Sequence, residues 1–206
     1  MKTTILAVAT LLACIAIAPV SGNAQSGDKL NAGDNMPVVA ANMRSATGSF
    51  STLTAAAKEN GLIVMFSCNT CPFVIKNQPI TQKVMAYAAA HNIGMVIVNS
   101  NEAQRSDADS YDAMVKYAQA QSYTVPYIVD DNSKLADAFG ASHTPEVFLF
   151  NNKGKLVYKG AMNDNPSDPA GYKKMYIEDA INAMIAGKEV NPNATKSVGC
   201  GIKRKA

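Results

Sequence analysis

Short apolar runs alternate with longer amphipathic segments along the chain from residue 62 onward. The run Leu62–Phe66 is continuous but short, which is typical of a buried strand rather than a helix. A second such run is Ile93–Val98. Between them, Pro72–Ala90 is long enough for a helix, which Pro79 should kink because proline removes one backbone hydrogen bond. Apolar residues recur at helical spacing in Ala108–Gln121, which predicts an amphipathic helix.

The second half of the chain continues this alternation of strands and helices. The predicted elements are a strand at Tyr127–Val129, a helix through Phe139, hairpin strands at Glu146–Phe150 and Leu156–Lys159, and a last helix at Tyr172–Ala186. Upstream, Met36–Thr54 favours two short elements around a turn. Alternation of this kind builds a central sheet with helices on both faces, so the sequence predicts an α/β fold.

The first residues have the plan of a secretory signal peptide. One charge, Lys2, precedes the apolar segment Ile5–Val20, and small residues at Gly22 and Ala24 fit a cleavage site after Ala24. The mature chain is then expected to begin at Gln25. We therefore expect an exported protein, periplasmic or secreted.

Two alternatives exist for this leader. As a membrane span, the apolar segment is somewhat short of the ~20 residues that a bilayer needs. As a lipoprotein signal it would present Cys14 for acylation after Leu11-Leu12-Ala13, but the apolar run continues past Cys14 and Leu12 fits poorly. No other segment is apolar enough to span a membrane, so we expect no membrane span in the mature chain.

Length and charge narrow the function classes further. The roughly 180 residues after the leader suit one domain, predicted at 25–190, followed by a polar tail at 191–206. Nineteen basic and sixteen acidic residues are interspersed, which leaves no basic face for nucleic acid. The mature chain has three cysteines, an odd number, so one is left over from any disulfide.

Cys68 and Cys71 stand where the first buried strand gives way to a helix. Backbone N–H groups and the positive dipole end at a helix N-terminus favour a thiolate. A strand–Cys-x-x-Cys–helix sequence is typical of a thioredoxin-like redox motif. We expect Cys68 to lie at or just before the helix start, to be the more exposed thiol and to attack. Cys71, further into the helix, is expected to be shielded and to resolve.

Other uses of this cysteine pair remain open. Zinc needs four ligands, and the only histidines, His91 and His143, are not paired at zinc spacing. A purely structural disulfide would close too small a loop to restrict the unfolded chain much. Soft thiolates also select Cu(I), so an inert pair or a copper site stays as an alternative.

The order of elements, the sequence CNTCP and the dipeptide Thr144-Pro145 before the hairpin resemble the thioredoxin superfamily. The N-terminal strands and the insert from Asn99 to Phe139 resemble its redoxin branch, which holds peroxiredoxin-like proteins and exported thiol–disulfide oxidoreductases. The resemblance implies a thioredoxin-like fold, a central mixed sheet flanked by helices with N-terminal redoxin-type strands. It implies Cys68 as the attacking and Cys71 as the resolving cysteine. It also implies Pro145 as a cis-proline facing them, with the backbone of Thr144 free to pair with a bound polypeptide.

The function expected from this resemblance is that of an exported thiol–disulfide oxidoreductase. It would act on protein thiols and disulfides, need a recycling redox partner and use no cofactor. A thiol peroxidase is one alternative, but its Pro-x-x-x-Thr-x-x-Cys motif is not matched, because Thr70 is adjacent to Cys71. A copper-binding chaperone is another, with His143 as the third ligand, although related copper proteins separate their cysteines by three residues.

The sequence departs from a simple thioredoxin at three places. The chain has no tryptophan, Pro72 follows the second cysteine, and Cys200 has no counterpart. Glycines and basic residues surround Cys200, so we expect a flexible, reachable and somewhat acidified thiol. Cys200 is then either an idle tail thiol or a second-stage resolving or intermolecular cysteine.

Overall fold

The computed structural model describes residues 29–39, 43–50 and 52–205. The predicted leader, including Cys14 and the expected cleavage site before Gln25, lies outside the described residues. Within the described ranges no helix is both long and apolar enough to cross a membrane.

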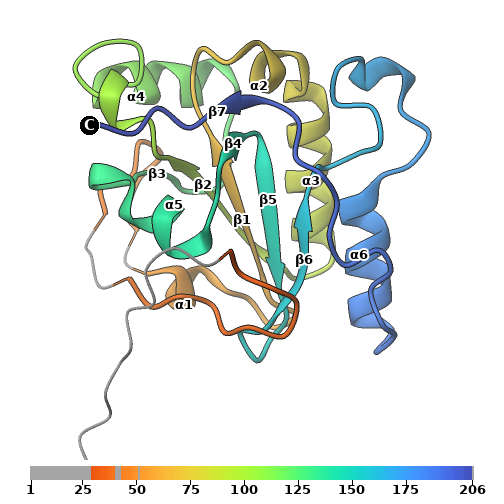
Figure 1. Ribbon diagram of the computed structural model, residues 1–206. Helices are drawn as coiled ribbons and strands as arrows, with labels where there is room; N and C mark the ends of the chain where they lie inside the picture. Colours follow the sequence, from red (N-terminus) through yellow and green to blue (C-terminus); the bar gives the residue numbers. More distant parts are fainter. Residues whose placement is uncertain (1–28, 40–42, 51, 206) are drawn as a thin grey trace, which may run out of the picture.

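A five-stranded mixed sheet forms the centre of the molecule (Figure 1). The central strand β1 (Leu62–Ser67) pairs in parallel with β2 (Gly94–Asn99) and antiparallel with β5 (Glu146–Phe150). Strand β3 (Tyr127–Val129) lies parallel beyond β2, and β6 (Leu156–Gly160) lies antiparallel beyond β5. The predicted thioredoxin-like α/β fold with a mixed sheet is therefore confirmed.

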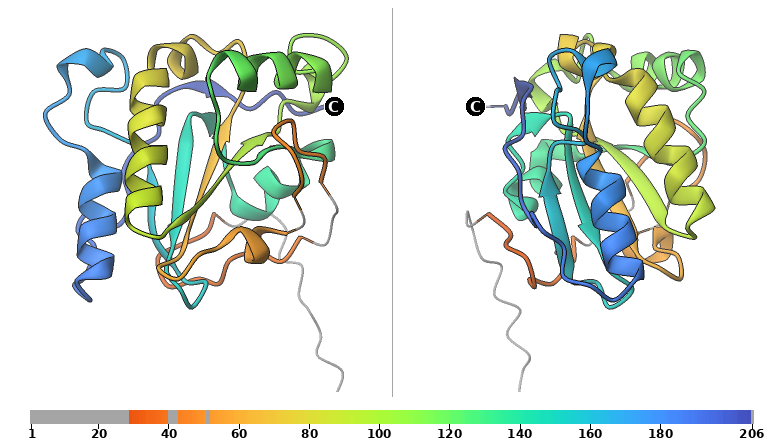
Figure 2. Two further views of the ribbon diagram at one scale, coloured as in Figure 1. Left: turned by 180° about the vertical axis from the view of Figure 1, so that it is seen from behind. Right: turned by 90° about the vertical axis from the view of Figure 1, so that its right-hand side faces the viewer.

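Strand β1 is buried on both faces, which explains its unbroken apolar sequence. Ile63 and Met65 face one core, which is closed by α3 (Gln78–Ala90), α4 (Tyr111–Ala120) and α6 (Tyr176–Ile185). Leu62, Val64 and Phe66 face the other, closed by α1 (Leu53–Ala56) and α5 (Lys134–Phe139). Figure 2 shows the sheet between α3 and α6 on one side and α5 on the other. The two packed layers fix the end of β1, where the cysteines follow.

The helix predicted over Pro72–Ala90 is divided in two. Helix α2 (Pro72–Lys76) ends at Asn77, and α3 begins at Gln78. The side chain of Asn77 donates to the carbonyl oxygens of Phe73 and Pro166, both at 2.8 Å. Pro79 lies in the first turn of α3, where a missing N–H costs little. The break thus lies two residues before the predicted kink.

The predicted N-terminal strands are only partly present. Over 29–39 and 43–50 the chain makes isolated bridges, from Asn35 to Lys155 and from Ser45 to Ile128, rather than extended ladders. These segments run along the sheet without adding a strand to it. The last helix is also shorter than predicted, because residues 172–175, which follow η3 (Pro169–Gly171), are irregular. Two further short helices are η1 (Glu102–Gln104) and η2 (Asp131–Ser133).

The segment predicted as a polar tail is attached to the domain. It runs from α6 along β6, where the hydroxyl of Thr195 lies 2.6 Å from that of Tyr158 and accepts from the N–H of Ala161 at 3.0 Å. It then crosses the end of the sheet as β7 (Cys200–Gly201), which pairs antiparallel with β4 (His143–Thr144) (Figure 1). Backbone hydrogen bonds hold this segment against the domain. Hydrophobic periodicity, from which the elements were predicted, does not reveal such bonds.

Candidate active site

Cys71, and not Cys68, lies at the N-terminus of α2. Strand β1 ends at Ser67, the next residues form a bend, and Cys71 is the N-cap residue of α2 with Pro72 in its first turn. Cys68 and Cys71 are both free thiols and both buried, with 2% and 4% of their surface exposed. The expectation that Cys68 occupies the helix terminus as the more exposed thiol is therefore wrong. Helix α2 begins at Pro72, as predicted, and the bend separates Cys68 from the helix cap.

Side-chain hydrogen bonds fix the bend between the two cysteines. The backbone N–H of Asn69 donates to Asp109 Oδ1 at 2.9 Å. Its side-chain Nδ2 donates to the carbonyl oxygen of Ala108, also at 2.9 Å. The hydroxyl of Tyr127 donates to Asn69 Oδ1 at 2.8 Å. Asn69 is thus bonded through both its backbone and its side chain, which holds the spacing of the two sulfurs.

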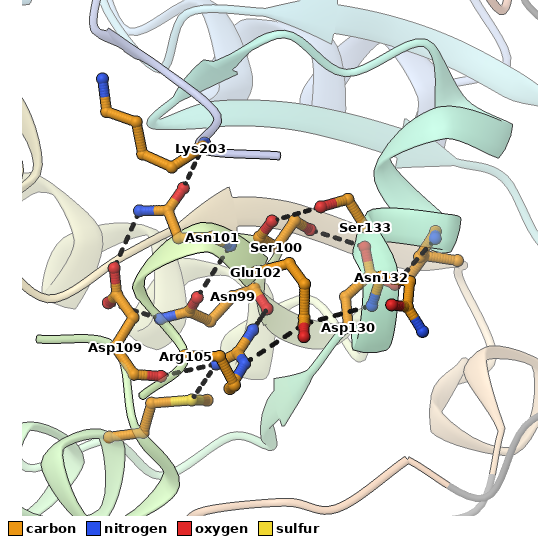
Figure 3. Close-up of polar contacts among 12 residues, drawn as sticks. Asn99, Ser100, Asn101, Glu102, Arg105, Asp109, Asp130, Asn132, Ser133 and Lys203 are labelled. Carbon is orange, nitrogen blue, oxygen red and sulfur yellow. Dashed lines mark hydrogen bonds and ion pairs between the residues drawn. The ribbon is translucent and has the colours of Figure 1, made fainter. Parts of the chain in front are cut away.

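The carboxylate of Asp109 joins this bend to two asparagines, Asn99 and Asn101, whose contacts with Asp109 Figure 3 shows. Asp109 is fully buried. Besides Asn69, it accepts from Asn99 Nδ2 at 2.7 Å and from Asn101 Nδ2 at 2.8 Å. Asn101 Oδ1 in turn accepts from the backbone N–H of Lys203, at 2.9 Å. One buried carboxylate therefore connects the cysteine bend with the C-terminal segment.

The Thr144–Pro145 peptide bond is cis, as predicted, and Thr144 contacts both cysteines. Its hydroxyl oxygen lies 3.4 Å from Cys68 Sγ. Its carbonyl oxygen lies 3.3 Å from Cys71 Sγ and accepts from that thiol when it is protonated. The predicted proximity of this dipeptide to the cysteine pair is confirmed.

The two sulfurs differ in their affinity for a proton. The pKa of Cys71 is lowered to about 4, first by a hydrogen bond from the Cys68 side chain, then by the Cys200 side chain and by the backbone N–H groups of Val74 and Cys200. The pKa of Cys68 is raised because its thiol donates to Cys71, because it is buried and because the charge of Asp109 lies nearby. These contacts favour placing the negative charge of the pair on Cys71.

This arrangement predicts an unusual pH profile for alkylation of Cys71. Because only the thiolate reacts, the rate at an ordinary cysteine rises about tenfold per pH unit up to a pKa near 8.5. For folded protein we expect half-maximal reaction of Cys71 with iodoacetamide near pH 4, followed by a plateau. Peptide mass spectrometry from about pH 3 to about pH 9 measures this, with unfolded protein as the control. A rate at Cys71 that keeps rising above neutral pH would contradict the charge assignment.

Cys200 belongs to the same cluster. It lies opposite Thr144 in the β4–β7 pair and packs against Cys68, Cys71 and Val74. It is half-buried rather than freely exposed, and burial raises its pKa to about 11. The expectation of a flexible, acidified thiol is therefore wrong, because strand pairing places Cys200 against the other two thiols.

His143 has a different role from the one considered for copper. Its backbone pairs with Gly201, its N–H donates to Glu146 Oε2 at 3.1 Å, and its ring Nδ1 lies 2.9 Å from the hydroxyl of Ser142. In the part of the chain that the structure describes, no three or more His, Cys, Asp or Glu side chains are grouped to hold a metal ion. The geometry there gives the copper alternative no support.

Comparisons with known proteins identify the family. The family model described as Redoxin matches residues 31–176, most of the chain. The protein therefore belongs to the redoxin family, whose thioredoxin-like fold supports thiol-based redox activity in general. No curated protein matches the chain significantly.

Several solved structures share the fold. An uncharacterised conserved protein from Geobacillus kaustophilus is 28% identical, with a TM-score of 0.77 over 88% of this chain and 96% of its own. A hypothetical protein from Sinorhizobium meliloti 1021 is also 28% identical, with a TM-score of 0.76 over 88% of this chain and 98% of its own. The peroxidoxin BcpB of Mycobacterium tuberculosis, at 15% identity and a TM-score of 0.54, covers 75% of this chain and 96% of its own. At that identity it is similar in fold alone.

The sequence analysis missed the polar residues that support the cysteines. These are Asn99, Asn101, Asp109 and Tyr127. One indication was available: Asn99 ends the strand parallel to β1 and lies opposite Ser67, so its side chain had to reach the same edge of the sheet. No such indication exists for Asp109, because it lies in an irregular segment whose path the sequence pattern does not predict.

Proposed function

We propose that the protein is an exported thiol–disulfide oxidoreductase in which Cys71 attacks and Cys68 resolves. The observation that carries this proposal is the placement of two buried thiols on one bend, with Cys71 at the N-terminus of α2. A thiolate with a low pKa is present at neutral pH, and a second thiol lies beside it to complete the exchange.

The exchange proceeds in two balanced steps. The Cys71 thiolate attacks one sulfur of a substrate disulfide, the S–S bond breaks, and the leaving sulfur takes up a proton. Cys68 then gives up its proton, and its sulfur attacks Cys71 in the mixed disulfide and releases the second substrate thiol. The substrate gains two electrons and the pair Cys68–Cys71 becomes a disulfide, which a recycling partner must reduce. Run in reverse, the same steps oxidise substrate thiols.

The protonation of Cys68 favours this division of roles. While Cys71 is a thiolate, the buried Cys68 keeps its proton, partly because of Asp109. When Cys71 has entered a mixed disulfide its charge is gone, and with it the hydrogen bond that holds the proton on Cys68. Resolution therefore becomes easier only after attack has occurred.

The arginines favour disulfide exchange over peroxide reduction. Peroxidases of this superfamily use an arginine near the reactive cysteine. Here all three arginines have other partners: Arg44 lies over the ring of Tyr111, Arg105 donates to the carbonyl oxygens of Asn99 and Asp109, and Arg204 pairs with Asp137. We therefore expect only slow turnover of peroxide.

Paired assays of the purified protein test this function. We expect catalysed reduction of insulin disulfides by dithiothreitol, and peroxide consumption close to the rate of the reductant alone. A Cys68→Ser, Cys71→Ser variant serves as the blank. Rapid peroxide turnover without insulin reduction would replace the proposal with the peroxidase alternative.

A further inference from the structure

The C-terminal strand covers the edge at which a polypeptide was expected to bind. The resemblance to the thioredoxin superfamily implied that the backbone of Thr144 pairs with a bound polypeptide. In the structure the antiparallel partner of Thr144 is Cys200, from the same chain. An extended segment that pairs with an open strand edge is a common way to bind a polypeptide. Strand β7, which lies beside β4 in Figure 1, therefore occupies a peptide-binding position, and its Cys200 packs against the cluster that contains Cys68 and Cys71.

Contacts after Cys200 hold this strand in place. The N–H of Ile202 donates to the carbonyl oxygen of Ser142 at 3.0 Å, and the Ile202 side chain is buried in the core that contains α5. Lys203 donates to Asn101, as Figure 3 shows. Arg204 bonds Asp137 Oδ1 at 2.7 Å and the carbonyl oxygen of Ala141 at 2.8 Å. The strand is thus fastened just beyond its cysteine.

Before Cys200, the close approach depends on a glycine. A Cβ atom at Gly199 would overlap the carbonyl oxygen of Thr144, so any larger residue forces the two backbones apart. At Gly201 the nearest such atom is the carbonyl oxygen of Ser142 at 4.0 Å, which leaves room for a methyl group. A side chain is therefore expected to disrupt the structure at Gly199 but not at Gly201.

We propose that Cys200 is a third redox-active cysteine, which forms a disulfide with Cys71 as an alternative to Cys68, and that β7 acts as an internal substrate strand. This inference rests on the proposed attack by Cys71. The external substrate that would compete with β7 is an extended polypeptide that carries a cysteine or a disulfide. Such a polypeptide must displace β7 to pair with Thr144.

The chemistry balances with glutathione disulfide as oxidant. The Cys71 thiolate attacks glutathione disulfide, which forms a Cys71–glutathione bond and releases one glutathione thiolate. The Cys200 thiol then loses its proton, and its sulfur attacks Cys71 and displaces the second glutathione. Cys71 and Cys200 together lose two electrons, and one glutathione disulfide becomes two glutathione thiols after protonation.

Peptide mapping of a Cys68→Ser variant tests the inference. After oxidation of the folded protein by glutathione disulfide, we expect a Cys71–Cys200 disulfide and no bound glutathione. Stable glutathione on Cys71, with Cys200 still open to alkylation, would overturn the inference and leave the proposed function intact. No reaction at Cys71 at all would instead count against the proposed function. Adding Cys200→Ser to this variant should trap glutathione on Cys71.

The flanking glycines supply a matched pair of variants in the same Cys68→Ser background. Gly199→Ala should slow formation of the Cys71–Cys200 disulfide by about tenfold or more, because the undocked strand presents Cys200 at a lower effective concentration. Gly201→Ala should leave the rate within about twofold. Both substitutions lie in the terminal segment, outside the two cores. Equal rates in the two variants would show that docking of β7 does not deliver Cys200 to Cys71.

Discussion

Replacing Cys71 by serine is expected to abolish the reaction with disulfides. In a single-turnover experiment with a chromogenic aromatic disulfide, Cys71→Ser should lower the rate of the first thiol release by more than about a thousand-fold. The hydroxyl that replaces the thiolate is not ionised at neutral pH. Cys68 is a poor substitute, because its thiol stays buried beside the charge of Asp109. Absorbance of the released thiol gives the rate directly.

The matched control for this prediction is Cys68→Ser. It should keep a rapid release of the first equivalent, because attack needs only Cys71, and Cys200 can then displace the second. Both variants replace one buried cysteine by a serine of similar size, so effects on folding are comparable. A rapid release in Cys71→Ser that is missing in Cys68→Ser would return the attacking role to Cys68.

Removing the carboxylate of Asp109 is expected to cost more stability than any other change to the polar residues around the cysteines. Asp109→Ala leaves the donors from Asn69, Asn99 and Asn101 without their acceptor in a buried place. Each unsatisfied buried donor costs about 1–3 kcal/mol, and partial relaxation makes the sum smaller, so we expect a loss of about 3–5 kcal/mol in the free energy of unfolding. Urea denaturation measures it.

Two further variants make this result specific. Asp107→Ala removes an exposed carboxylate from the same segment and should change stability by less than about 0.5 kcal/mol. Asp109→Asn keeps one acceptor but directs an amide at another donor, so it should fall between the two. It also removes the negative charge beside Cys68, which should lower the pKa of that thiol. A stable Asp109→Ala protein would mean that these donors find other partners.

The sequence was sufficient for the sheet because its strands are buried. The runs Leu62–Phe66 and Ile93–Val98 and the first hairpin strand are buried on both faces, and burial of that kind leaves a nearly unbroken apolar pattern. Thr144-Pro145 could be placed because it stands directly before the hairpin. The shortened last helix shows the usual uncertainty at helix ends, where apolar spacing continues into a turn.

The proposed division of roles between the cysteines could not be predicted from the sequence, because it depends on the conformation of the residues between β1 and α2. Three residues of bend place Cys71 rather than Cys68 at the helix terminus. The position of Cys200 was also beyond sequence patterns. Strand β7 is two residues long, and its pairing with Thr144 depends on a close backbone approach at Gly199. Neither the bend before α2 nor the pairing of β7 produces a periodic pattern of hydrophobic residues in the sequence.

Trapping of a substrate protein tests the assignment of Cys71 most directly. Reduced Cys68→Ser, Cys200→Ser protein keeps Cys71 alone, and Cys71→Ser, Cys200→Ser protein keeps Cys68 alone, in the mature chain. Each is mixed with a disulfide-bonded protein such as insulin and analysed on a non-reducing gel and by mass spectrometry. Our account predicts a substrate-linked adduct in the first variant and none in the second. An adduct through Cys68 alone would contradict it.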